Sequence, residues 1–175
     1  MRKFKMMSIL FLAVFPFYGQ QKTDDKKIIL AMIDAYSESI IKKDSIMFYS
    51  LFNEENVVWC AGYKNRTQAR EIELKGKDGV GSNYFSGSYK GFLRGLFKYQ
   101  AAEDKFDNIK IIEDGTVASL TMDYSFWVDD KMTNWGCKYL NLIKKNGKWK
   151  ITSVIYSLEL TKYFKQPEIK ERRND

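Results

Sequence analysis

Histidine is absent from the 175-residue sequence, and only two cysteines and two prolines occur in it. Without histidine, the protein cannot use the histidine base of the common serine and cysteine hydrolases, and most zinc sites are excluded as well. Cys60 and Cys137 lie far apart and form no Cys-x-x-Cys motif. A disulfide is therefore only weakly indicated, and we expect two buried thiols that do not pair with each other. We expect neither a metal nor a cofactor.

No apolar run is long enough to cross a membrane, which takes about 20 residues. One shorter run, Met6–Tyr18, follows the basic residues Arg2, Lys3 and Lys5. This arrangement is typical of a secretory signal, so we predict a signal peptide at residues 1–20. The alternative is an uncleaved N-terminal anchor. We expect an exported protein, periplasmic or secreted, with no stable membrane insertion after cleavage.

Net charge and length limit the remaining possibilities. The formal charge of +7 falls to +4 (7 − 3) when the three basic residues of the signal are removed. Acidic and basic residues are mixed along the rest of the chain, so we expect no nucleic-acid partner. The remaining 155 residues (175 − 20) suffice for one domain. We place this domain at residues 28–164, after a polar lead-in at 21–27 and before a disordered tail at 165–175.

Local patterns predict helices first and strands afterwards. We expect an amphipathic helix at 28–43, a short helix opened by Asp44, a strand at 57–60, an irregular region at 63–88 with a short strand near 71–74, a helix at 88–97, and strands at 106–112, 116–128 and on both sides of Asn146-Gly147. This order predicts a cone-shaped α+β fold, with helices packed on the concave face of a strongly curved, mostly antiparallel sheet.

The closing hairpin Trp135–Leu158 is the best-defined segment, because Asn-Gly favours a type I′ turn. Strict alternation from this turn divides its side chains between two faces. One face looks like ordinary packing surface. The other mixes aromatic and hydrogen-bonding residues, as the wall of a ligand cavity would; it carries Trp135, Cys137, Tyr139, Asn141, Val154 and Tyr156.

The element order, with Tyr36 in the first helix, Asp44 opening the second, VVWCAG at 57–62 and the closing NGKWKITSVIYS, resembles the nuclear-transport-factor-2-like superfamily. Within it, the chain is most similar to SnoaL-like and ketosteroid-isomerase-like proteins. The resemblance implies oxyanion donors at Tyr36 and Tyr139, and it places the isomerase base at Cys60. A thiol is a poor substitute for a carboxylate base.

Asp123 is the carboxylate of interest in the strand 116–128. Alternation with apolar neighbours places it in water, whereas the family resemblance turns it toward the cavity, and one bulge decides between them. If it faces the cavity, Asp123, Tyr36 and Tyr139 are the weak catalytic candidates. The residues that we expect to bind a ligand are Tyr36, Trp59, Cys60, Trp127, Trp135, Cys137, Tyr139, Asn141, Val154 and Tyr156.

These observations favour a binding protein for a small, partly apolar ligand, such as a polyketide-like or lipid-like compound, in a cavity between the first helix and the sheet. One alternative is an isomerase, dehydratase or cyclase that uses proton transfer in the same cavity. Another is a protein-interaction module that uses the sheet face. Because large apolar residues occur on both faces of the closing hairpin, we also expect a homodimer formed through the outer face of the sheet.

Overall fold

The computed structural model describes residues 18–167. Nearly all of the expected signal peptide and most of the expected tail lie outside the described residues. The elements in chain order are α1 (Tyr18–Lys42), α2 (Ser45–Ser50), β1 (Val58–Tyr63), α3 (Asn65–Lys75), a 3-10 turn η1 (Lys77–Gly79), β2 (Tyr84–Ser86), α4 (Tyr89–Leu96), β3 (Ala102–Glu113), β4 (Val117–Val128), β5 (Lys131–Lys145) and β6 (Lys148–Leu160).

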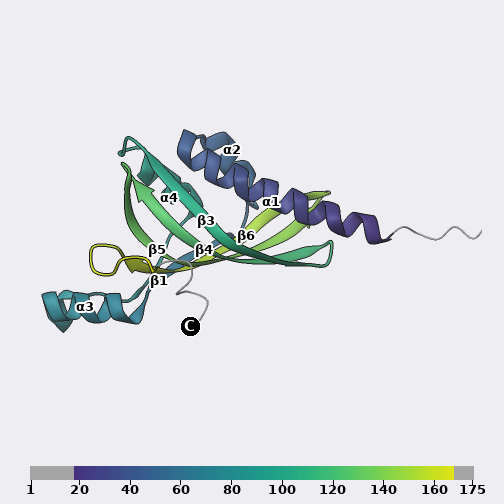
Figure 1. Cartoon of the computed structure of the whole chain (residues 1–175). Coiled ribbons are helices and arrows are strands. Elements are labelled where there is room, and N and C mark those ends of the chain that lie inside the picture. Colours follow the sequence, from purple (N-terminus) through teal and green to yellow (C-terminus); the bar gives the residue numbers. More distant parts are fainter. Residues whose placement is uncertain (1–17, 168–175) are drawn as a thin grey trace, which may run out of the picture.

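All six strands form one open sheet in the order β2-β1-β6-β5-β4-β3. The pairs are antiparallel except for β1 and β6, which run parallel. The sheet is strongly bent, and α1 runs along its concave side (Figure 1). The predicted α+β fold with helices on a curved, mostly antiparallel sheet is therefore confirmed.

Helix α1 buries an apolar stripe with steps of three and four residues, as the sequence predicts. The stripe consists of Ile29, Met32, Ile33, Tyr36 and Ile40. The helix begins at Tyr18, well before the expected start at residue 28, so the polar segment at 21–27 is not a loose lead-in. Asp25 accounts for part of this extension, because its buried carboxylate accepts hydrogen bonds from Lys144 Nζ (2.6 Å) and Trp149 Nε1 (3.0 Å).

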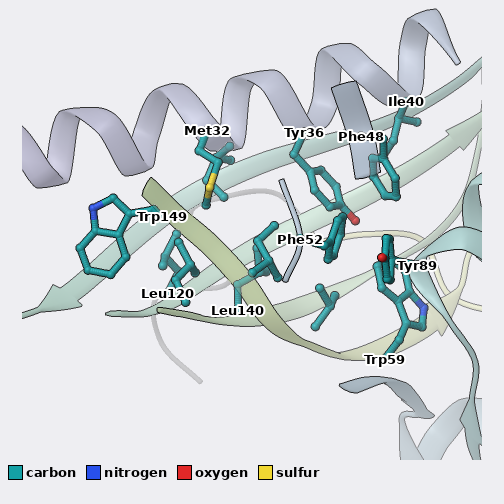
Figure 2. Packing of buried hydrophobic residues seen from close by; sticks show 14 of the residues in the cluster. Met32, Tyr36, Ile40, Phe48, Phe52, Trp59, Tyr89, Leu120, Leu140 and Trp149 are labelled. Carbon is teal, nitrogen blue, oxygen red and sulfur yellow. The ribbon is translucent and has the colours of Figure 1, made fainter. Parts of the chain in front are cut away.

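The short helices α2 and α4 begin at residues that cap them. The Asp44 side chain accepts a hydrogen bond from the Met47 amide, and Ser88 accepts one from the Gly91 amide. Both helices close the wide end of the sheet with aromatic rings. Phe52 stacks on Tyr89 with ring centroids 4.3 Å apart, and Phe48 lies 5.2 Å from Tyr36 (Figure 2). This cluster connects the helices to α1.

Residues 65–75 form helix α3, where the sequence analysis predicted irregular chain with a short strand near 71–74. That prediction is wrong because α3 has little apolar surface and is held by polar contacts. Arg66 Nε and Thr67 Oγ1 both donate to the fully buried carboxylate of Glu159 in β6. Glu71 accepts from Lys162 Nζ and Tyr163 Oη, each at 2.7 Å.

The closing hairpin has the predicted turn and a bulge that was not predicted. Asn146 and Gly147 have φ values of 52° and 75°, as a type I′ turn requires, and Lys145 lies opposite Lys148. Further along, Asn141 pairs with Ser153 and Leu142 with Ile151, which leaves Thr152 as the extra residue. This bulge exchanges the two faces of β6 relative to β5.

The predicted cavity wall of the hairpin is therefore split between the two faces of the sheet. Val154 and Tyr156 lie on the concave face, opposite Leu140 and Lys138 of β5. Cys137, Tyr139 and Asn141 lie on the outer face, and Tyr139 is 50% exposed. The assignment of these six hairpin residues to one face is thus wrong, because the single extra residue at Thr152 changes the alternation.

The two cysteines, both among the described residues, form no disulfide, as expected. They are half-buried rather than buried. Cys60 pairs with Ile155, which in turn pairs with Tyr139, so Cys60 lies on the outer face of the sheet. Among the described residues, no helix has the length and apolar character needed to cross a membrane.

Candidate functional site

A buried ion pair lies on the concave face of the sheet. Asp104 of β3 is 0% exposed and Lys138 of β5 is 3% exposed, and the Lys138 ammonium donates to Asp104 Oδ2. The backbone carbonyl of Asp104 also accepts a hydrogen bond from Ser37 Oγ of α1 at 2.7 Å. Charged side chains are rarely buried this completely, because leaving water costs several kcal/mol per ion. The pair is therefore the most unusual feature of the core.

Four aromatic rings surround the Lys138 ammonium. Its Nζ atom lies 4.5 Å from the ring centroid of Tyr124, 5.1 Å from Phe106, 5.4 Å from Tyr156 and 5.5 Å from Tyr36. These rings come from β4, β3, β6 and α1, so the tertiary fold assembles the cage. Attraction between a desolvated cation and the faces of such rings offsets part of the lost hydration.

Burial moves the pKa values of the pair toward the neutral forms. It raises the pKa of the Asp104 carboxyl and lowers the pKa of the Lys138 amine, while the opposite charge of each partner acts against both shifts. A proton can therefore pass between the two groups at lower cost than in water. Burial also raises the pKa of Tyr156 to about 12 and those of Tyr36 and Tyr124 well above their usual value. The three hydroxyls stay protonated near neutral pH and can donate hydrogen bonds.

Two buried polar atoms at this site lack a hydrogen-bond partner among the described residues. They are Oδ1 of Asp104 and the hydroxyl of Tyr36. By contrast, the Tyr124 hydroxyl contacts the Asn134 side chain at 3.0 Å and donates to the Ser157 carbonyl at 3.1 Å. A buried polar group without a partner costs about 1–3 kcal/mol. Asp104 Oδ1 is thus available to a molecule bound beside the pair.

A cavity of about 180 Å³ opens beside the pair. It reaches from the buried pair to Phe85, which is 39% exposed. Apart from the pair and Asn134, its lining is apolar or aromatic: Trp59, Phe85, Phe92, Tyr124, Phe126, Tyr156 and Leu158. An apolar cavity of about 150 Å³ is enough to hold benzene. The cavity therefore suits a one-ring compound with a polar group at the inner end.

This cavity lies between α4 and the sheet, whereas the sequence analysis placed it between the first helix and the sheet. The lining residues come from all six strands and from Phe92 of α4. Among the described residues, helix α1 contributes none to this lining, and its Tyr36 ring lies against Lys138 behind the cavity wall. Larger hollows occur elsewhere, including one of about 560 Å³ beside the Asn146-Gly147 turn. Two more, of about 590 and 370 Å³, lie beside Asp123 and Cys137, and Trp135 also lines the smaller of the two. Among the described residues, none of these three hollows is lined by both partners of a buried ion pair.

Some of the residues predicted from the sequence meet at this site. Trp59 and Tyr156 line the cavity, and Tyr36 belongs to the aromatic cage. Val154 is fully buried on the same face, in register with Trp59. These four residues converge because α1, β1 and β6 all turn an apolar face toward the core.

The other predicted residues lie elsewhere. Cys60, Cys137, Tyr139 and Asn141 are on the outer face of the sheet, where no donor or base can reach this cavity. Trp135 packs under Lys64 and Arg66 near α3, with ring distances of 4.7 and 5.3 Å. Trp127 lies against Lys105, at 4.5 Å.

Asp123 also lies on the outer face, directly opposite Cys137. Its Oδ2 atom accepts a hydrogen bond from Asn108 Nδ2 at 2.7 Å, and the Cys137 thiol lies 3.7 Å from Oδ1. Of the two orientations considered for Asp123, the structure thus has the one that points away from the cavity. The catalytic arrangement with Asp123 as base is wrong for this cavity.

The sequence analysis missed Asp104 and Lys138, although the alternation of side chains along their strands could have identified them. Lys138 is two and four residues from Leu140 and Leu142, so it lies on the same face of the strand, which the sequence places on the packing side. Asp104 precedes the predicted start of its strand, so its alternation with Ala102 and Phe106 was not considered. A charged residue in phase with core residues on two strands is the pattern that could have identified the pair.

The described part of the chain has no cluster of three or more histidine, cysteine or acidic side chains that could hold a metal ion. No family model matches the sequence. No curated protein sequence matches it either.

Solved structures nevertheless share its architecture. A nuclear-transport-factor-2-like (NTF2-like) protein of unknown function from Pseudomonas putida is 11% identical, with a TM-score of 0.56, over 77% of this chain and 87% of that chain. A protein of unknown function from Mycobacterium tuberculosis is 15% identical, with a TM-score of 0.59, over 80% and 75%. LinA is 7% identical, with a TM-score of 0.57, over 80% and 89%. The chain therefore has the nuclear-transport-factor-2-like fold.

Proposed function

We propose that this protein binds a small, partly apolar ligand in the cavity between α4 and the sheet. The observation that carries this proposal is the unpartnered Oδ1 atom of Asp104, a residue that lines a cavity with aromatic walls. A ligand whose polar end donates a hydrogen bond to this atom would remove the cost of leaving it unsatisfied. Its apolar body would contact Trp59, Phe92 and Phe126.

The cavity volume limits the size of this ligand. About 180 Å³ holds one aromatic ring with a short substituent. This size favours a one-ring compound over the polyketide or lipid considered from the sequence. For about eight non-hydrogen atoms, we expect a dissociation constant on the order of 1 mM or tighter.

Binding of benzyl alcohol, measured by ligand-observed NMR or calorimetry, tests the proposal. Phe92→Trp should abolish binding, because the larger ring fills the cavity between Trp59 and Phe126, which lie 4.9 and 5.8 Å from the Phe92 ring. The matched control is Phe97→Trp, at a position just after α4 that is 56% exposed. Equal binding by both variants, or no binding by the wild type, would contradict the proposal.

Proton transfer is a second candidate function, favoured by the position of Asp104. Its unpartnered Oδ1 and a pKa raised by burial make the Asp104 carboxylate a stronger base than an exposed carboxylate, as a general base requires. An enzyme of this kind would catalyse deuterium exchange at the α-carbon of a small aryl ketone in D2O. Asp104→Asn should abolish this exchange, whereas Asp123→Asn on the outer face should leave it unchanged.

We also propose that the protein is exported. The basic start and the apolar run within residues 1–20 support it, and residues 1–17 lie outside the described residues. N-terminal sequencing of protein recovered from the periplasm or medium would test it. A protein found only in the cytoplasm with its first residues intact would count against export.

A further inference from the structure

The Lys138 amine has the surroundings of a reactive group. Its Nζ atom is at the inner end of the cavity, and Asp104 is the hydrogen-bond acceptor that it contacts. The remaining sides of the amine face four aromatic rings, which accept no ordinary hydrogen bond. A lysine in such a desolvated position is the usual starting point for covalent chemistry with carbonyl compounds.

Asp104 can hold the proton that the amine must release. Transfer of one proton from Lys138 to Asp104 converts the ion pair into a neutral amine and a neutral acid, and burial favours both neutral forms. The nitrogen then has a free electron pair next to the cavity. The Tyr36 ring lies 5.5 Å from Nζ, and its hydroxyl has no partner among the described residues.

We propose that Lys138 forms a reversible imine with a small aryl aldehyde or ketone bound in the cavity. This inference rests on the proposed function, because the carbonyl compound must first enter the same cavity. The aromatic walls and the volume of about 180 Å³ select a one-ring compound, and the buried amine selects a carbonyl group. Lys138 thereby becomes the covalent attachment point and Asp104 the proton carrier.

The reaction is balanced without any further reagent. The Nζ electron pair adds to the carbonyl carbon, and the C=O π electrons move to the oxygen, which takes the proton held by Asp104. Asp104 then accepts one proton from the nitrogen, which gives a neutral carbinolamine. Return of that proton to the hydroxyl releases water as the nitrogen electron pair forms the C=N bond. The product is an iminium ion paired with the Asp104 carboxylate, which has the same charge as the original ammonium pair.

Reductive trapping with benzaldehyde and sodium cyanoborohydride at pH 6.5 tests the proposal on the wild-type protein. Peptide mapping by mass spectrometry would compare benzylation of Lys138 with that of exposed lysines such as Lys90 and Lys110. We expect Lys138 to be modified at least about tenfold faster, because a buried amine keeps a larger unprotonated fraction than an exposed lysine. Benzyl alcohol, which has a similar size but no carbonyl group, should protect Lys138 and leave the exposed lysines reactive.

Two variants and one binding measurement separate the possible results. Lys138→Arg should lose the fast adduct, and Asp104→Asn should slow its formation. If benzyl alcohol binds the wild type but Lys138 reacts no faster than exposed lysines, the imine is overturned and the binding site stands. If benzyl alcohol does not bind and Lys138 does not react, the proposed function fails as well. Because the decisive comparison uses the wild type, it does not depend on the folding of either variant.

Discussion

Asp104 and Lys138 occupy core positions where two apolar side chains of similar size would avoid any loss of hydration. The attraction between them and the surrounding rings offsets this loss only in part. Replacing a buried ion pair by apolar residues is often neutral or stabilising, whereas removing one partner leaves an uncompensated charge. Comparing the stability of a variant that lacks one partner with that of a variant that lacks both can therefore show whether the pair is kept for stability or for another role.

Lys138→Met alone should lower the free energy of unfolding by about 3–5 kcal/mol, because the Asp104 carboxylate then lacks its partner. The double variant Asp104→Leu/Lys138→Met should lie within about 1 kcal/mol of the wild type or above it. Urea denaturation at pH 7 measures both values.

Lys42→Met serves as the control, since the Lys42–Glu38 pair on α1 is exposed. It should leave stability close to that of the wild type, because exposed ion pairs contribute little. A double variant as unstable as Lys138→Met would mean that the pair is kept for stability, which would weaken its assignment to ligand chemistry.

At the scale of elements, local patterns predicted the fold well where one feature dominates the local energy. The apolar stripe of α1, the caps at Asp44 and Ser88, and the Asn146-Gly147 turn each act within a few residues. Helix α3 was missed because its stability comes from Glu71 and Glu159, whose partners lie far along the chain.

The candidate site was harder to predict, because it depends on the pairing register between strands. The extra residue at Thr152 places Tyr156 opposite Lys138 instead of opposite Cys137. A bulge of this kind leaves no clear mark in the sequence, since Thr152 is an ordinary strand residue. Burial of Lys138 likewise depends on a partner 34 residues away in the sequence.

The ion pairs and hydrogen bonds of Glu71 in α3 lead us to predict how the stability of the protein changes at acid pH. Hydrogen bonds from Lys162, Lys75 and Tyr163 lower the pKa of Glu71 from 4.5 to about 2. A carboxyl with a depressed pKa contributes stability above its unfolded pKa, and this contribution is lost as pH falls through the folded value. Between pH 5 and pH 2, the wild type should therefore lose more stability than Glu71→Gln.

Thermal unfolding monitored by circular dichroism across this range would measure the difference between the two proteins. Glu73→Gln is a suitable control, because Glu73 pairs with Arg70 on the exposed side of the same helix. It should follow the wild type at every pH. Parallel curves for wild type and Glu71→Gln would show that the contacts of Glu71 do not hold α3 in place.

For the whole molecule, the main asymmetry is between the two faces of the sheet. Helices α1, α2 and α4 pack over the concave face and enclose the core (Figure 1, Figure 2). The outer face keeps large apolar side chains in contact with solvent: Val58, Val117, Tyr139, Ile143 and Ile155 are each between 39% and 51% exposed. They lie on the neighbouring strands β1, β6, β5 and β4, so they form one surface. Apolar surface of this kind marks an interaction site.

We propose that a second copy of the chain covers this face and forms a two-fold dimer, sheet against sheet. Ile155 lies between Cys60 and Tyr139 in the middle of the surface. In a two-fold interface, each substitution occurs twice, so Ile155→Asp introduces two carboxylates into one apolar contact. Light scattering at about 10 µM should then show a dimer for the wild type and a monomer for this variant, because burying an unpaired charge costs several kcal/mol.

Ile46→Asp provides the matched control for this experiment. Ile46 is 83% exposed at the start of α2, away from the outer face of the sheet, and an acidic residue in the first turn of a helix is well tolerated. This variant should remain a dimer. Benzyl alcohol should bind the monomeric Ile155→Asp variant as well as it binds the wild type, because the cavity opens on the opposite face of the sheet. A monomeric wild-type protein, or a dimer that persists in Ile155→Asp, would show that the outer face is not the interface between two copies.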